Sequence, residues 1–283
     1  MPKPKLLYQP TDSPARVAAF MSGSGSNITR LLELQQRLAA AGKRPFEVAA
    51  IVTDNPDPAL CNARKIAAEF RGIPLVELDI KAFYAKRGHP RVTIRTDRGF
   101  DIREQYSDRL WEMLTPYAPD IAALGGFVPL INLVGKLPAI NVHPGDLSVL
   151  VDGQRYLVGL HTIPIKRAIR ANIGELRTST ILATPYTKKL EMDEGPVLMI
   201  SRPLPIELPQ GLTVDDFKKA ENKPLLEQIA KEHQNRLKEV GDWEVFPLTV
   251  QMVAEGRFAM DEAKTVYFDG ELLACGVKLP LGD

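Results

Sequence analysis

The stretch Arg16-Val-Ala-Ala-Phe-Met-Ser-Gly-Ser-Gly-Ser-Asn27 decides the fold. Its first part, up to Met21, is a short apolar run that stops at a loop of glycines and serines. Apolar residues then recur at helical spacing from Ile28 onward. This order predicts a strand, a glycine loop and a helix.

The same alternation of strand and helix continues through the first half of the chain. Further strands are predicted at 46–53, 74–78 and 120–126, and further helices at 59–70 and 105–117. Strands separated by helices favour a parallel sheet with right-handed crossovers. Residues 87–101 are the most loop-like stretch, with Gly88, Pro90 and Gly99 among mixed charges. The first half is therefore expected to be an open, doubly wound α/β unit.

The second half has a different pattern. Strands are predicted at 178–184 and 197–204, a hairpin at 266–273 with Asp269-Gly270 at its turn, and helices at 214–240 and 246–255. The whole chain is thus expected to be α/β, with a mostly parallel, Rossmann-like sheet and a C-terminal extension of strands and helices.

Charge and composition exclude several classes of protein. The 36 Lys+Arg and 35 Asp+Glu balance to a formal charge of +1, which argues against a nucleic-acid binder that works through a basic surface. No uncharged apolar run approaches the roughly 18–20 residues of a membrane span, and residues 1–14 lack a signal-peptide core. Cys61 and Cys275 fit neither a disulfide framework nor a metal cluster. We expect a cytoplasmic protein without metal that acts on small molecules.

The loop at residues 22–27 is a candidate anion site. Its glycines let backbone N–H groups approach a ligand closely, and the start of the helix that follows favours phosphate. It matches neither the dinucleotide fingerprint nor the P-loop, because Gly23-x-Gly25 lacks a third glycine and no Gly-Lys-Ser/Thr follows. A plain tight turn with a helix cap is the alternative.

Two polar residues at a predicted strand end suggest acyl chemistry. Asn141 and His143 share one face of an extended segment, where an amide can stabilise an oxyanion and an imidazole can move a proton. Asp193, in a turn before a predicted strand, is a candidate to orient the histidine. A satisfied structural histidine and an ordinary turn are the alternatives.

The order of these motifs resembles the phosphoribosylglycinamide formyltransferase family. The motifs that carry the resemblance are Ser22-Gly-Ser-Gly-Ser-Asn27, Pro119-Asp-Ile-Ala-Ala-Leu-Gly-Gly-Phe127, Asn141-Val-His-Pro144, Gly159-Leu-His-Thr162, Thr178-Ser-Thr180 and Asp193-Glu-Gly-Pro-Val197. The resemblance implies transfer of a formyl group from 10-formyltetrahydrofolate, as co-substrate, to the amine of glycinamide ribonucleotide in purine biosynthesis. It also implies one formyltransferase domain at 16–283 after an extension at 1–15, with a phosphate-binding half at 16–140 and a catalytic and folate-binding half at 141–283.

The resemblance also assigns roles to residues. Asn141, His143 and Asp193 match the catalytic trio. The phosphate of the ribonucleotide is expected on Ser22, Gly23, Ser24, Gly25, Ser26 and Asn27. Folate contacts are expected from Arg103, toward the glutamate tail, and from the segment Val128, Pro129, Leu130 and Ile131.

Several departures from the family pattern put the accepting amine in doubt. Pro129 stands where the family has an arginine, and the segment after His143 is enlarged up to Tyr156. His161 is retained and Asp242 replaces a glutamate that contacts the ribose, so both are candidate substrate contacts. Further insertions are expected at 87–101, 147–158 and 214–240.

Three alternatives stay open. The chain could be a formyltransferase for a different phosphorylated or sugar-linked amine. It could be a formyltetrahydrofolate hydrolase, although such proteins usually carry an N-terminal regulatory domain and only about fifteen residues precede Arg16 here. It could also be an inactive ligand-binding relative, since fold alone does not establish activity. The sequence leaves the oligomeric state open, a homodimer included.

Overall fold

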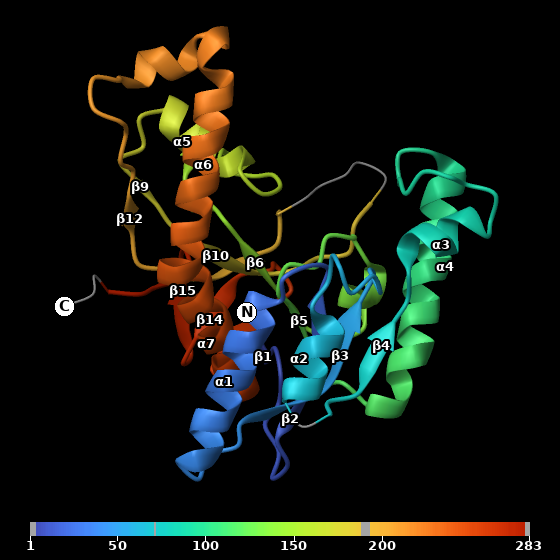
Figure 1. Cartoon of the computed structure of the whole chain (residues 1–283). Helices are drawn as coiled ribbons and strands as arrows, with labels where there is room; N and C mark the ends of the chain where they lie inside the picture. Colours follow the sequence, from blue (N-terminus) through green and yellow to red (C-terminus); the bar gives the residue numbers. More distant parts are fainter. Residues whose placement is uncertain (1–3, 71, 188–192, 281–283) are drawn as a thin grey trace.

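The computed structural model describes residues 4–70, 72–187 and 193–280. Its centre is an eight-stranded sheet with the order β16-β11-β10-β6-β5-β2-β3-β4 (Figure 1). From one edge to the other the strands are β16 (Val277–Lys278), β11 (Val197–Ile200), β10 (Ser179–Leu182), β6 (Ala139–His143), β5 (Ile121–Leu124), β2 (Ala15–Met21), β3 (Phe46–Thr53) and β4 (Leu75–Glu77). The five strands from β6 to β4 run parallel, whereas β10 runs antiparallel to both β6 and β11. The predicted open, mostly parallel sheet is confirmed.

Helices cover both faces of this sheet. On β2, Val17 and Met21 pack into one apolar cluster, and Phe20 packs into another on the opposite face, as the alternation of a strand requires. The first cluster contains side chains of α1 (Ser26–Ala40), α2 (Ala63–Glu69) and α7 (Trp243–Ala254). The second contains side chains of α3 (Ile80–Ala85) and α4 (Asp97–Leu114). The fold is therefore doubly wound, as expected.

A smaller apolar cluster lies beyond the sheet. It joins α5 (Ile163–Arg170) to α6 (Lys223–Leu237), with Phe217 of the short helix η3 (Val214–Lys218) fully buried between them. Figure 1 shows α5 and α6 together, away from α3 and α4. The remaining short elements here are β7 (Leu150–Val151), β8 (Gln154–Arg155), β9 (Glu175–Leu176), β12 (Leu204–Pro205) and η4 (Ala220–Asn222).

A second sheet joins the amino end of the described chain to strands near its carboxyl end. Its order is β1-β13-β14-β15, and it consists of β1 (Lys5–Leu6), β13 (Phe258–Met260), β14 (Val266–Phe268) and β15 (Glu271–Leu273). The predicted hairpin at 266–273 is present, and both turn residues, Asp269 and Gly270, have positive φ. Two 3₁₀ turns, η1 (Thr115–Tyr117) and η2 (Asn132–Gly135), flank β5.

Some predicted boundaries were wrong, each for a tertiary or capping reason. The helix expected from residue 59 begins at Ala63, because the Asp57 carboxylate binds the Ala59 N–H and the Gly23 carbonyl binds the Asn62 N–H. Part of the loop expected at 87–101 is the first turn of α4, where the Thr96 hydroxyl caps the Gly99 N–H.

The helix expected at 214–240 begins only at Lys223, after the short 3₁₀ helices η3 and η4, and it joins the helix expected at 246–255 in one helical run. α6 passes into a π-helical turn, η5 (Lys238–Asp242), which leads directly into α7. Gly241 in that turn lies against Thr178, the residue before β10, since a Cβ there would lie 2.5 Å from the Thr178 hydroxyl. No helix in the described ranges is long and apolar enough to cross a membrane.

Candidate active site

The carboxyl end of β6 presents the first two candidate residues. Asn141 and His143 lie two positions apart on this strand, opposite Ile181 and Ser179 of the antiparallel neighbour β10. His143 is only 3% exposed, although it also lines a cavity described below. The site thus lies where the sheet changes from parallel to antiparallel.

Asp193 contacts His143, although the two residues are far apart in the sequence. The His143 Nδ1 atom lies 3.4 Å from Asp193 Oδ1, and the second ring nitrogen, Nε2, lies 2.7 Å from the Leu157 carbonyl oxygen. Because a carbonyl oxygen only accepts, Nε2 is the ring nitrogen that donates to Leu157, and Nδ1 is the nitrogen that faces the carboxylate. The structure therefore brings together two of the three predicted catalytic residues through a direct contact.

The surroundings of Asp193 keep it ionised. Burial raises the pKa of Asp193, but the His143 hydrogen bond and charge, the Gly159 N–H and Arg155 outweigh burial and hold the pKa below its ordinary value. The Gly159 N–H donates to Asp193 Oδ2 at 3.1 Å. A carboxylate that faces the His143 ring follows from this arrangement.

Arg155 was not singled out from the sequence, yet it holds the Asp193 segment. Its Nη1 donates to the carbonyl oxygens of Asp193 and Gly195, the latter at 2.8 Å. Arg155 belongs to the β7–β8 hairpin, which is the enlarged loop after His143. No local pattern marks an arginine in such a loop, so only the tertiary structure identifies it.

A cavity of about 260 Å³, called here the loop cavity, lies beside His143. Five of the six residues of the predicted anion loop line it: Gly23, Ser24, Gly25, Ser26 and Asn27. The other lining residues come from the end of β5, the end of β6, the 159–161 turn, Asp193 and the α6–η5 run. The cavity thus joins the predicted phosphate loop to all three members of the predicted trio.

Ser22, the sixth loop residue, ties the loop to the next segment. Its hydroxyl donates to Asp54 Oδ1 at 2.5 Å and accepts the Val128 N–H at 2.9 Å. Burial raises the pKa of Asp54, against the hydrogen bond from Ser22. The Ser22 hydroxyl is therefore engaged by protein groups.

The two candidate substrate contacts also line the loop cavity. His161 is exposed and has a φ of 55°, and Asp242 is 6% exposed. Thr178 Oγ1 donates to Asp242 Oδ1 at 2.6 Å, and burial raises the pKa of this carboxyl above its ordinary range. Asp242 therefore forms a buried hydrogen bond and also lines the cavity. Gln234 and Lys238, which the sequence did not indicate, stand beside it.

A second cavity of about 100 Å³, called here the segment cavity, contains the predicted folate residues. Val128, Pro129, Leu130 and Ile131 all line it. The loop cavity and the segment cavity share Phe127, Val128, Asn141, Leu160 and Asp193. Asn141 and Asp193 thus stand at the junction between the two cavities.

Arg103 lies beneath the segment instead of on the surface. It is 5% exposed; its Nη1 donates to the Leu130 carbonyl at 2.9 Å and its Nε to the Tyr84 hydroxyl at 3.2 Å. Its guanidinium therefore fixes the backbone of the predicted folate segment. Direct contact with a glutamate tail stays a prediction.

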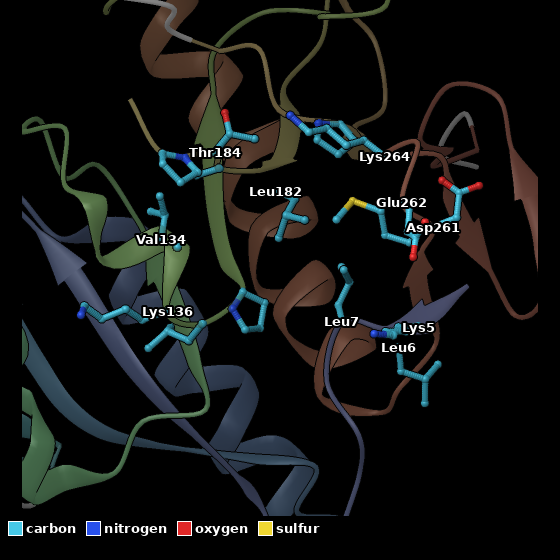
Figure 2. Close-up of a pocket in the computed structure, with 17 residues that line it drawn as sticks. Lys5, Leu6, Leu7, Val134, Lys136, Leu182, Thr184, Asp261, Glu262 and Lys264 are labelled. Carbon is cyan, nitrogen blue, oxygen red and sulfur yellow. The ribbon is translucent and has the colours of Figure 1, made fainter. Parts of the chain in front are cut away.

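A larger cavity lies elsewhere in the described part of the chain. It has a volume of about 720 Å³, and Figure 2 shows it with Leu7 and Leu182 near its middle. Its lining includes no member of the trio, but it shares Val134, Ala183 and Thr184 with the segment cavity. The chemistry-bearing residues gather in the two smaller cavities.

Comparisons with known proteins agree with this fold. The chain is 27% identical over 180 residues to the phosphoribosylglycinamide formyltransferase of Escherichia coli (strain K12), which covers 62% of this chain and 68% of that protein. The solved phosphoribosylglycinamide formyltransferase of Coxiella burnetii matches with a TM-score of 0.61 at 21% identity, over 95% of this chain and 100% of that one. A formyltetrahydrofolate deformylase from Pseudomonas putida KT2440 matches with a TM-score of 0.53 at 14% identity, over 91% and 71%. No model of a protein family matches the chain. The chain thus has the formyltransferase fold, and its resemblance to the phosphoribosylglycinamide formyltransferase family is confirmed.

Proposed function

We propose that the protein transfers a formyl group from 10-formyltetrahydrofolate to the amine of glycinamide ribonucleotide. The observation that carries this proposal is the junction of the loop cavity with the segment cavity at Asn141 and Asp193. A group-transfer enzyme needs a donor site and an acceptor site that meet at its reacting groups. Residues 16–283 would work as one domain, because both cavities draw on both halves of the chain.

The loop cavity is the acceptor site in this proposal. Gly25 has a φ of 70° at the amino end of α1, so backbone N–H groups of the first turn are open to an anion. A phosphate bound there would leave the rest of the acceptor to extend toward Asn141 and Asp193. The segment cavity would receive the pteridine end of the folate, held by backbone groups of residues 128–131 and without metal.

The trio then performs the transfer. The acceptor amine attacks the formyl carbon, a C–N bond forms, and the bond to folate N10 breaks. The Asn141 amide donates to the oxyanion of the tetrahedral intermediate. Both His143 ring nitrogens already have protein partners, so we assign the proton from the amine to the Asp193 end of the pair, from which it passes to N10. The His143 ring, held between the Leu157 carbonyl and Asp193, keeps the Asp193 carboxylate in position for this transfer.

A different phosphorylated or sugar-linked amine is the second candidate acceptor. Asp242 stands where the family resemblance expects a ribose-contacting glutamate, and its shorter side chain accepts the Thr178 hydroxyl instead. A site with this carboxylate turned to the interior favours an acceptor whose hydroxyl groups are placed differently from those of a ribose.

The test is a release assay with the purified protein, 10-formyltetrahydrofolate and glycinamide ribonucleotide. We expect tetrahydrofolate to appear by absorbance, and His143→Ala at unchanged melting temperature to lose the activity. Turnover only with another amine would assign the second candidate. Folate release without any amine would indicate a hydrolase, and failure to bind any folate would contradict every enzyme reading.

A further inference from the structure

The inserted helical run contributes two side chains to the loop cavity. Gln234 of α6 and Lys238 of the π turn η5 line it together with the anion loop. Both side chains are half-buried. π turns carry an extra residue within a helix and occur frequently at functional sites. Lys238 and Asp242 are the first and last residues of this turn, and both line the cavity.

The anion loop has no cation of its own. Residues 22–27 contain serine, glycine and asparagine alone, so the loop offers backbone N–H groups and hydroxyls without a full positive charge. Among the residues that line the loop cavity, all of which the structure describes, Lys238 is the only lysine or arginine. Within the described chain Lys238 forms no ion pair at 4.0 Å or less. Its charge is therefore available to a ligand.

Asp242, at the other end of the same π turn, forms no ion pair with Lys238 at 4.0 Å or less. Asp242 accepts the Thr178 hydroxyl, and its burial raises its pKa; the hydrogen bonds from Thr178 and Asn27 and the charge of Lys238 lower that pKa without outweighing burial, so the attraction between Asp242 and Lys238 is weak. The side chain of Asn27 also has an acceptor atom, Oδ1, without a donor among the described residues. This side chain is 7% exposed and lines the cavity. Among the described residues, Lys238 thus has no ion-pair partner and Asn27 Oδ1 has no donor.

We propose that Lys238 binds the anionic group of the acceptor at the amino end of α1, and that Gln234 and Asn27 bind neighbouring hydroxyl or amide groups. The acceptor is then a phosphate monoester that carries an amine, and not a neutral amine. This inference rests on the proposed function, because it assigns the loop cavity to the acceptor. Lys238 is a specificity residue in this scheme and takes no part in the chemical step.

Inorganic phosphate is the first probe, because its binding requires no turnover. Calorimetric titration of the wild-type protein should show binding, and Lys238→Ala should weaken it at least about tenfold, since a charge-assisted hydrogen bond is lost. Lys238→Met, which keeps most of the apolar stem, is the second variant if the alanine variant unfolds. Lys231→Ala is the matched control, because Lys231 is exposed on the same helix and outside the cavity.

Steady-state kinetics give the second readout. Lys238→Ala should raise KM for the acceptor about tenfold, with kcat and KM for 10-formyltetrahydrofolate unchanged. Phosphate bound through Lys238 without formyl transfer would sink the proposed function and leave this site intact. Transfer with an unchanged acceptor KM in Lys238→Ala, an equal loss in Lys231→Ala, or no phosphate binding to the wild-type protein would each overturn the inference.

Discussion

The anion loop and the catalytic trio reach the same cavity by different routes. The loop is one contiguous segment, residues 22–27, whose shape follows from β2, α1 and a glycine in the left-handed region. The trio joins the end of β6 to a distant turn, and the Arg155 hairpin and the Leu157 carbonyl hold the two parts in place. The loop therefore depends on backbone conformation, whereas the trio depends on contacts between segments far apart in the chain.

Asp193→Asn should produce the largest effect. The amide keeps the shape of the carboxylate but loses its charge toward His143, so we expect kcat to fall by about 100- to 10,000-fold with little change in stability. The release assay and a thermal melt measure the two quantities. Asp152→Asn is the control, since Asp152 is exposed at the turn between β7 and β8 and should leave kcat unchanged. An active Asp193→Asn protein would remove Asp193 from the trio.

Gly25→Ala tests the loop through stability. A Cβ at Gly25 would lie 2.4 Å from Met21 Cε and 2.5 Å from Ile66 Cδ1, at a φ of 70°. We expect a loss of about 2–4 kcal/mol in the free energy of unfolding, measured by urea titration, together with weaker phosphate binding. Gly23→Ala is the matched control, because a Cβ there meets nothing within 4 Å. Equal stability of the two variants would show that the backbone conformation of Gly25 does not determine the structure of the loop.

Arg155→Ala tests the tertiary support of the trio. Freeing the Asp193 and Gly195 carbonyls should lower kcat about tenfold and leave both KM values unchanged. Arg155 also lowers the pKa of Asp193, so its loss raises that pKa and moves the acidic limb of the pH–rate profile to higher pH. Arg177→Ala, which removes an arginine bound to the Ser201 carbonyl, should shift neither quantity. If the acidic limb of the pH–rate profile does not move, Arg155 has only a structural role.

The sequence predicts the parts of the molecule that local patterns encode. Alternation of apolar runs with helical spacing yields β2, α1 and the doubly wound sheet. The i, i+2 relation of Asn141 and His143 holds because a strand end imposes it. Pairing of His143 with Asp193 was inferred from the order of motifs, and the 3.4 Å contact agrees with it.

Other features depend on contacts that no local pattern reveals. Arg155 and Lys238 lie in insertions, where an arginine or lysine is typical of any solvated surface, and only the packing of the hairpin and the helical run directs them to the site. The late start of α2 follows from a hydrogen bond to Gly23, a residue far away in sequence. The continuity of α6 with α7 depends on the π turn against Thr178.

The β7–β8 hairpin has a consequence for the lifetime of the active protein. Leu150 and Val151 are 58% and 47% exposed at its start, so a protease can reach a segment that the site cannot lose. A single cut between Val151 and Gln154 would leave β6, the anion loop and Asp193 intact on the two fragments. It would, however, free Arg155 from its hairpin. Such a nicked protein would keep its sheet and its melting transition while its turnover declined.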